Sequence, residues 1–394
     1  MPPATFRLIL LISCAHALVH TFELALPAVE QLIGEEFGVG KDVTGQLGMV
    51  WRLPFGLAAI GAGWLADRYG SRLLLIVYLL GCSATAVAVW WAPTLTVVFV
   101  VMFVMGCFAS IYHPAGLALI SRETTPETRG TALGWHGILG SIGIAGAPFL
   151  ASIVFEQHLG DWRGYYVMLT IPAFVIAALL LRSLLASTER HEARERSDRG
   201  IVSREPIHWR SFVVLVSAGA LSGFVYAAFM HFLPRYVDTS NLRPDNWTPE
   251  SFRNVLAATV LLCAAFGQAL AGRLCGPGKL ERLLILVLLG NIPPLLWMAF
   301  AEGPQRFIAA CGLAFVHFMN QPVYNSLIAQ HIPASRRSFG YGFSNMMCFG
   351  IGATGPMFAG RFTDDATVYS LLAAFAGVAG MLAIVVSRST LASE

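Results

Sequence analysis

One acid and two histidines at helical spacing are the residues of this sequence best suited to proton chemistry. Glu23 follows His20 by three positions and His16 by seven. At 100° per residue, the three side chains fall within about 60° of arc on one helical face. A carboxylate exchanges protons and a histidine titrates near neutral pH. The spacing therefore predicts one polar stripe with the chemistry of a proton carrier.

The surroundings of this stripe are apolar. The 394-residue chain is 56% hydrophobic and 12% charged, with a net charge of +3. Such a composition favours a lipid bilayer over water, and it lacks the basic stripe of a nucleic-acid-binding protein. Of the 23 acids, we place Glu23 alone well inside an apolar run. An ionisable group in hydrocarbon costs several kcal/mol unless it faces a partner or water, so Glu23 is a functional candidate.

Arg52 is the expected partner of Glu23. Counting helical rise, Glu23 lies about 24 Å up the first apolar run, and Arg52 lies about 10 Å below the outer surface on the second. We hypothesise that the two form an ion pair or share a substrate or proton, because each charge would be costly alone. A static pair that only fixes helix packing is the alternative.

Other polar groups within apolar runs are further candidates for binding protons or substrate. His113 and His136 are expected towards the cytoplasmic side and His231 towards the outside, so they cannot share one site. The segment Val316 to Asn325 offers groups at helical spacing that suit a small polar ligand: His317, Gln321, Tyr324 and Asn325. Hydrogen bonding between packed helices is the other interpretation of each of these residues.

A metal site is weighed and not predicted. Imidazole and carboxylate bind transition metals, but the sequence shows one three-residue stripe with no assured fourth ligand. The seven cysteines have no metal-ligand spacing and are interpreted as free thiols. No cofactor is predicted either.

Apolar runs of about 20 residues span a bilayer as helices. We count twelve such runs, with approximate bounds 7–33, 45–66, 73–91, 94–121, 131–156, 164–186, 211–237, 251–275, 283–301, 304–330, 341–362 and 367–388. One long polar insert divides them, which predicts an N-terminal six-helix bundle (1–186), a cytoplasmic linker (187–210) and a C-terminal six-helix bundle (211–394).

The distribution of basic residues predicts the orientation. With both termini in the cytoplasm, 18 of the 26 Lys and Arg residues lie near cytoplasmic ends and 7 on the opposite side, with Arg52 inside a span. The first apolar run is too long for a signal-peptide core, so it is retained as the first span. We expect a multi-pass protein of the inner membrane, and a monomer.

The chain superposes on itself after a shift of 208 residues. Several matches preserve spacing through two helices and their loop: Pro114 with Pro322, Leu119 with Leu327, Ile120 with Ile328, Arg129 with Arg337, Gly134 with Gly342, and Pro148 with Pro356. A duplicated six-helix unit explains these matches.

The loop after the second span carries a specific motif. Gly63 to Arg72, GWLADRYGSR, resembles the loop signature of the major facilitator superfamily, G-x-L-A-D-R-x-G-R-R, with Ser71 in place of one arginine. A degenerate copy, GRLCGPGKLER, begins at Gly272. The resemblance covers nearly the whole chain. It implies an all-α membrane protein of 12 transmembrane helices in two pseudo-symmetric six-helix bundles.

The same motif predicts a conformational latch formed by Gly63, Asp67, Arg68, Gly70 and Arg72. Its glycines permit close helix approach, Asp67 can cap or face a helix N-terminus, and the two arginines can pair with acids at the cytoplasmic rim.

Span five contains GILGSIGIAGAP, which resembles the G-x-x-x-G-P signature of antiporters in this family, although an Ala separates Gly146 from Pro148. From the residues alone, Gly140, Gly143 and Gly146 allow close packing, and Pro148 bends the helix. The segments beginning at His16 and Ile111 look similar to the fosmidomycin-resistance-like branch.

The leading hypothesis is a secondary transporter that exports a small organic solute in exchange for protons. Uptake of an organic anion or metabolite is the runner-up. A transition-metal transporter and a channel or receptor remain open. A membrane-embedded enzyme is also weighed, but the sequence has no nucleophile-base motif, no H-E-x-x-H motif and no phosphate loop.

Overall fold

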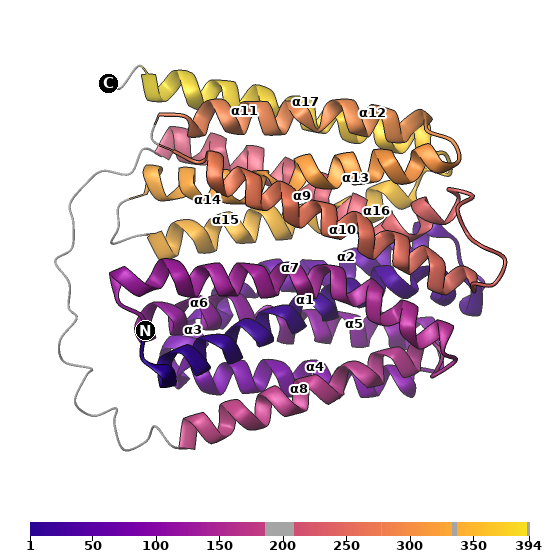
Figure 1. Ribbon diagram of the computed structural model, residues 1–394, viewed down its shortest axis with the longest axis horizontal. Helices are drawn as coiled ribbons and strands as arrows, with labels where there is room; N and C mark the ends of the chain where they lie inside the picture. The colour runs from indigo at the N-terminus through magenta and orange to yellow at the C-terminus, as the bar shows by residue number, and fades with distance from the viewer. Residues whose placement is uncertain (186–208, 277, 333–336, 392–394) are drawn as a thin grey trace.

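Every regular element in the part of the chain that the structure describes is a helix. The structure is a computed structural model that describes residues 1–185, 209–276, 278–332 and 337–391. The helices run along one long axis, and both chain termini lie at the same end of the bundle (Figure 1). Helices satisfy their own backbone hydrogen bonds, which a chain in hydrocarbon requires.

The first group of helices lies in the lower part of Figure 1. It comprises α1 (Pro3–Phe37), α2 (Lys41–Leu57), α3 (Ala59–Tyr69), α4 (Ser71–Trp90), α5 (Leu95–Ala109), α6 (Tyr112–Glu123), α7 (Pro126–Glu156) and α8 (Trp162–Leu185).

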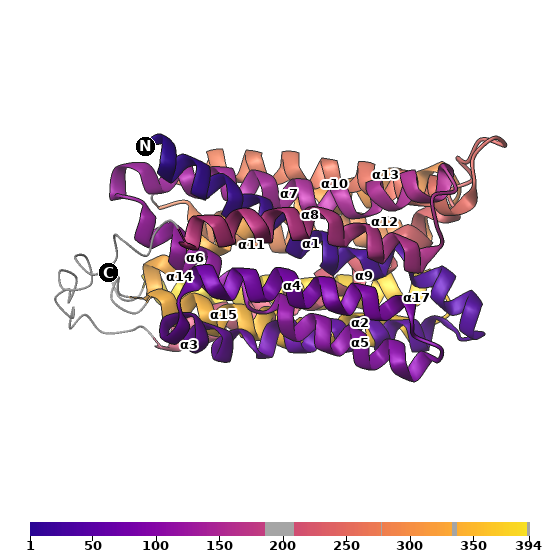
Figure 2. The ribbon, with the colours of Figure 1, turned by 90° about the horizontal axis from the view of Figure 1, so that it is seen from below.

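The second group of helices lies in the upper part of Figure 1. It comprises α9 (Trp209–Asp238), α10 (Pro249–Leu274), α11 (Leu280–Gly290), α12 (Ile292–Phe300), α13 (Pro304–Phe318), α14 (Asn320–His331), α15 (Arg337–Gly352), α16 (Thr354–Gly360) and α17 (Asp365–Leu391). Helices α7 and α10 pack side by side where the groups meet (Figures 1 and 2).

The number of membrane spans follows when consecutive helices separated by a short break are counted as one span. Nine helices or continuous pairs among the described residues are long and apolar enough to cross a membrane, and the α2–α3 pair, bent by 44°, makes a tenth. Two further pairs of consecutive helices are each counted as one span. Helices α13 and α14 are separated by a break at Met319, and α15 and α16 by a break at Ala353. Together these form the twelve-helix, two-bundle arrangement that the sequence predicted.

Helix breaks repeat with the shift of 208 residues. Adding 208 to the bounds of α6 gives residues 320–331, which are the bounds of α14. The same addition moves the start of α2, residue 41, to residue 249, where α10 begins. The two halves thus share the start of α2 with α10 and the bounds of α6 with α14, which supports duplication of one unit.

The predicted cytoplasmic linker (187–210) lies outside the described residues, apart from Trp209 and Arg210, which begin α9.

Glycines of α7 explain its close packing on α1. A side chain at Gly143 would collide with the backbone of Ala17, and one at Gly140 would collide with the ring of His16. Gly146 differs from the prediction, because a Cβ there would meet open space. Helix α7 continues through Pro148 to Glu156.

We predict that Gly143→Ala lowers the melting temperature of the purified protein in detergent. The added methyl must displace the α1 backbone, and overpacking of this kind costs about 1–3 kcal/mol. Gly146→Ala is the matched control: it meets no atom within 4 Å, so its melting temperature should be unchanged or slightly higher. Equal melting temperatures for the two variants would contradict the packing role of Gly143.

Candidate functional site

A buried ion pair joins α1 to α2. Arg52 Nη1 donates to Glu23 Oε1 at 2.5 Å, and His20 Nδ1 lies 2.8 Å from Glu23 Oε2. Glu23 is 1% exposed and Arg52 3% exposed. The pairing that the two depths predicted is present, and His20 supplies the second oxygen of the carboxylate with a partner.

Arg52 also reaches the second group of helices. Its guanidinium carbon lies 5.5 Å from the ring centre of Tyr226 on α9, and that ring stacks on His317 of α13 at 6.0 Å. His317 Nδ1 in turn lies 3.0 Å from Asn291 Oδ1. A continuous set of polar and aromatic groups therefore crosses between the two halves at the depth of Glu23.

Four histidines gather beside this ion pair. His16 Nε2 lies 3.1 Å from His20 Nε2, and the ring of His113 lies 5.4 Å from His16 and 5.7 Å from His20. His136 stacks on His16 with ring centres 3.7 Å apart. The sequence located the stripe on span one but not the approach of His113 and His136, because those residues come from α6 and α7.

Local structure explains this convergence. The break at Ser110 and Ile111 starts α6 one residue before His113, with Tyr112 at its first position. Tyr112 Oη donates to the carbonyl oxygen of Ile12 at 2.8 Å, which holds α6 against α1. Gly140 leaves the space that the ring of His16 fills.

His231 lies elsewhere, as the sequence predicted. Its Nε2 donates to the carbonyl oxygen of Thr44 at 2.9 Å, and its ring fills the space left by Gly48. It therefore joins α9 to α2 as a hydrogen-bonded packing residue.

The polar residues of span ten have separate partners. Gln321 Oε1 accepts a hydrogen bond from Gln268 at 2.7 Å, and Gln268 Oε1 accepts one from Ser141 at 3.0 Å. Tyr324 bonds to Ser344 at 2.7 Å, while the side chain of Asn325 is exposed. The break at Met319 divides the predicted cluster, so its members do not converge as one regular helix would place them.

The polar partners Tyr226, Asn291 and Gln268 were missed by sequence reasoning. Gln268 and Asn291 are amides inside apolar helices, so a search for every intramembrane polar group would have found them. Tyr226 gave no such signal, since a tyrosine in an apolar helix is ordinary.

The predicted latch is only partly formed as expected. Arg72 pairs with Glu123 at 2.7 Å, and Gly63 packs close to Pro114 of α6. Arg68 pairs with no acid among the described residues. Instead it lies over the rings of Trp64 and Tyr69, at 5.3 and 5.5 Å.

Of the two roles expected for Asp67, capping or facing a helix N-terminus, capping of α4 is not observed. Asp67 is exposed, and α4 begins at the N-cap residue Gly70 without a side-chain cap. Gly70 has a φ of 91°, which only glycine adopts without strain, so the turn between α3 and α4 requires glycine at this position.

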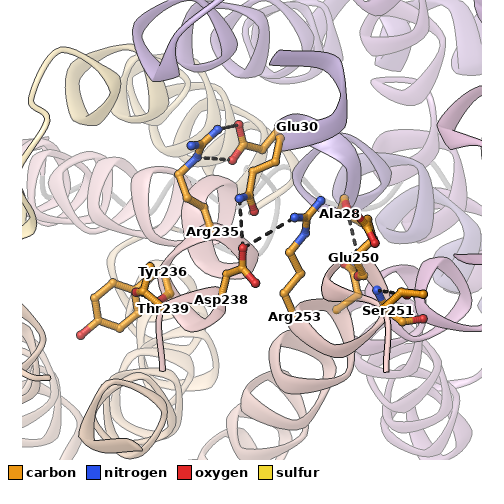
Figure 3. Close-up of polar contacts among 12 residues, drawn as sticks. Ala28, Glu30, Arg235, Tyr236, Asp238, Thr239, Glu250, Ser251 and Arg253 are labelled. Carbon is orange, nitrogen blue, oxygen red and sulfur yellow. Dashed lines mark hydrogen bonds and ion pairs between the residues drawn. The ribbon is translucent and has the colours of Figure 1, made fainter. Parts of the chain in front are cut away.

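A second acid is buried in α1, contrary to the prediction that Glu23 is alone. Glu30 is 1% exposed and accepts two hydrogen bonds from Arg235 of α9, at 2.7 and 3.0 Å. Nearby, Gln31 Nε2 donates to Asp238 at 3.3 Å, and Arg253 lies 3.6 Å from the same carboxylate (Figure 3).

More contacts between the halves lie at this end of the bundle, opposite the termini. Asn254 Nδ2 donates to the carbonyl oxygen of Ala28 at 3.0 Å, and Ser251 Oγ donates to that of Ser152 at 2.6 Å (Figure 3). The backbone of Pro356 lies directly against Gly45. The two halves are therefore closed against each other at the end opposite the termini.

Comparison with known proteins agrees with this architecture. Residues 9–356 match the model of the Major Facilitator Superfamily. The chain is 26% identical over 351 residues to a multi-drug resistance efflux pump PmrA homolog of Lactococcus lactis, covering 86% of this chain and 83% of that protein. It is 23% identical over 184 residues to a multidrug resistance protein B homolog of Mycobacterium tuberculosis, and this match spans 47% of this chain and only 33% of that protein.

A solved structure shares the fold. The crystal structure of a bacterial homolog of the human lysosomal transporter Spinster, in an inward-facing and unoccupied conformation, matches with a TM-score of 0.77 at 15% identity. The match covers 99% of this chain and 98% of that one.

We predict that the Glu23–Arg52 pair is energetically coupled. Glu23→Gln and Arg52→Gln should each lower the melting temperature strongly, because removing one member of a buried pair costs about 3–5 kcal/mol. The double variant should recover part of the loss, since neither charge is then left unpaired. Additive losses in this double-mutant cycle would show that the pair is not coupled.

Proposed function

This chain belongs to the major facilitator superfamily, and on that premise we propose that it is a proton-coupled secondary transporter that exports a small organic solute. Transport across a membrane follows from the family, whose model matches nearly the whole chain, and the chain is a transporter and not an enzyme. The solute, the direction and the coupling ion are the parts we propose.

The observation that carries the proposal is the buried polar set that joins the halves at the Glu23 level. Glu23, Arg52, Tyr226 and His317 form neighbouring contacts from α1 and α2 to α9 and α13. Such groups in a bilayer mark a substrate or ion route. Arg52 Nη2 is buried with no hydrogen-bond partner among the described residues, so it can donate to an acceptor on a substrate.

We assign alternating access to rocking of residues 1–186 against 211–394. The polar contacts around Glu30 and Arg235 close one end, and with both termini in the cytoplasm that end is the outer one. Opening outward must break the bidentate Glu30–Arg235 pair and the hydrogen bond between Asn254 and Ala28. On this orientation, we assign the contacts seen here to a state closed to the outside.

Proton coupling is assigned to Glu23. Both of its oxygens are bonded, one to Arg52 and one to His20. Protonating the carboxylate would weaken the Arg52 pair and free the guanidinium, which links the charge of Glu23 to the helices that Arg52 touches. A pair that only fixed helix packing would not require this link between the protonation of Glu23 and the position of the helices.

Export of an organic compound is supported by the relatives named for multidrug resistance and efflux. Uptake of an organic anion is the second candidate, and it is favoured by the buried Arg52 Nη2, for which the described part of the chain offers no hydrogen-bond partner. We further propose that the protein acts as a monomer in the inner (plasma) membrane, with the two halves as its moving parts.

We predict that transport in proteoliposomes depends on an imposed pH gradient and on Glu23. A panel of antibiotics, fosmidomycin among them, and fluorescent dyes should contain a solute whose flux is saturable and rises with the gradient. Glu23→Gln should reduce that flux at least about tenfold, which corresponds to about 1.4 kcal/mol.

The control is Glu302→Gln, which changes an exposed acid in a loop and should transport normally. Unaltered flux in Glu23→Gln would remove Glu23 from the coupling mechanism. Gradient-driven accumulation of an organic anion in the direction of uptake would favour the second candidate.

We also predict that Glu30→Gln shifts the protein towards an outward-open state. Spin labels placed at the exposed positions Asp42 and Thr363, after replacement of the seven native cysteines, report the outer separation of the halves. The distance distribution should gain a longer component, because the variant loses the charge of a bidentate pair. Glu302→Gln again serves as the control, and identical distributions would contradict a closing role for Glu30.

A further inference from the structure

The histidine cluster contains two lone pairs that face each other. His16 Nδ1 lies 2.7 Å from the carbonyl oxygen of His136, and a carbonyl only accepts, so this nitrogen carries the proton. His20 Nδ1 lies 2.8 Å from the Glu23 carboxylate and likewise donates. In the neutral rings, both Nε2 atoms are therefore acceptors, yet they lie 3.1 Å apart. Two acceptors at this distance repel unless a cation lies between them.

A third imidazole completes the group. Ligand atoms of His16, His20 and His113 all lie within 4.8 Å of one another. His113 Nε2 is buried and has no hydrogen-bond partner among the described residues. His113 as a whole is of intermediate burial, although its Nε2 is enclosed.

The distances suit a small metal ion. Two nitrogens bound at about 2.0–2.1 Å to one tetrahedral ion lie about 3.3–3.4 Å apart, close to the His16–His20 separation. The ligand atom of His113 lies within 4.8 Å of the other two, so its side chain must move closer to reach the same ion. Three imidazoles with an open fourth position is a ligand set that Zn²⁺ favours.

The outer contacts of the rings match those of metal ligands. A metal-bound histidine almost always donates its other N–H to a carboxylate or a backbone carbonyl, which fixes the tautomer and the ring orientation. His20 donates to Glu23 and His16 donates to the carbonyl oxygen of His136. Stacking on Tyr112 and His136 further holds the His16 ring in place.

We propose that His16, His20 and His113 form a binding site for a divalent transition-metal ion such as Zn²⁺. The ligands come from α1 and α6, both within the first half of the chain, so the site can persist while the halves move. Glu23 and the carbonyl oxygen of His136 orient two of the three ligands. The binding site does not depend on which solute is transported.

The test is metal binding by the purified full-length chain, carrying an affinity tag without histidines. Titration with Zn²⁺ in a calorimeter should give one site per chain, and Co²⁺ should give the visible absorption bands of a tetrahedral ion. X-ray absorption of the Zn²⁺ form should show about three histidine nitrogens at about 2.0–2.1 Å.

Variants locate the ion. His20→Gln and His113→Gln should each weaken Zn²⁺ binding at least tenfold, while His331→Gln should bind normally. His331 is a matched control, because it is also a buried histidine, and its Nδ1 bonds to the carbonyl oxygen of Leu327 in its own helix.

Three outcomes would overturn the proposal. The first is a folded wild-type chain that takes up a proton at the cluster but binds neither Zn²⁺ nor Co²⁺. The second is metal binding that is unchanged in both His20→Gln and His113→Gln. The third is an X-ray absorption spectrum of the Zn²⁺ form that shows no histidine ligands. The experiment measures metal binding and not solute flux, so failure to bind metal leaves the transport proposal untouched. Failure of the transport proposal likewise leaves the metal site untouched.

Discussion

Pairing of buried charge is the constraint on which the centre of this molecule depends. A carboxylate within hydrocarbon is stable only if its oxygens are satisfied, and Glu23 meets this condition with Arg52 on one side and His20 on the other. Each partner then fixes more of the structure: Arg52 lies against Tyr226 of the second half, and His20 orients towards His16. One acid thus connects the interface between the halves to the histidine cluster.

The contacts between the halves are of two kinds, and the difference bears on motion. At the end opposite the termini they include ion pairs and hydrogen bonds, such as Glu30 with Arg235, which can break when water enters. In addition, glycines bring backbones of the two halves together both at that end, where Gly45 meets Pro356, and elsewhere, where Gly56 meets Gly350. Directional polar contacts close an end firmly but reversibly, whereas close backbone contacts provide a surface on which two helices can pivot.

The histidines show which contacts the spacing of residues in the sequence can predict and which it cannot. Spacing on one helix located His16, His20 and Glu23 on a common face, and the structure retains that face. The arrival of His113 and His136 depends on the break before α6 and on the space at Gly140, and neither is a periodic feature of the sequence. Arg68 and Asp67 show the opposite failure, since a recognisable motif did not determine their partners.

The sequence by itself determined the helical spans, their number, the internal repeat, the family resemblance and the pairing of Glu23 with Arg52. All of these follow from local hydrophobicity, from spacing or from depth in the bilayer, which are properties of the chain read in order. Only the tertiary structure decided that Glu30 is buried against Arg235, that Tyr226 links the halves and that three histidines from two helices converge. Those facts depend on how helices distant in the chain rotate and approach one another. Small residues and helix breaks in several segments set this together, so no single segment encodes it.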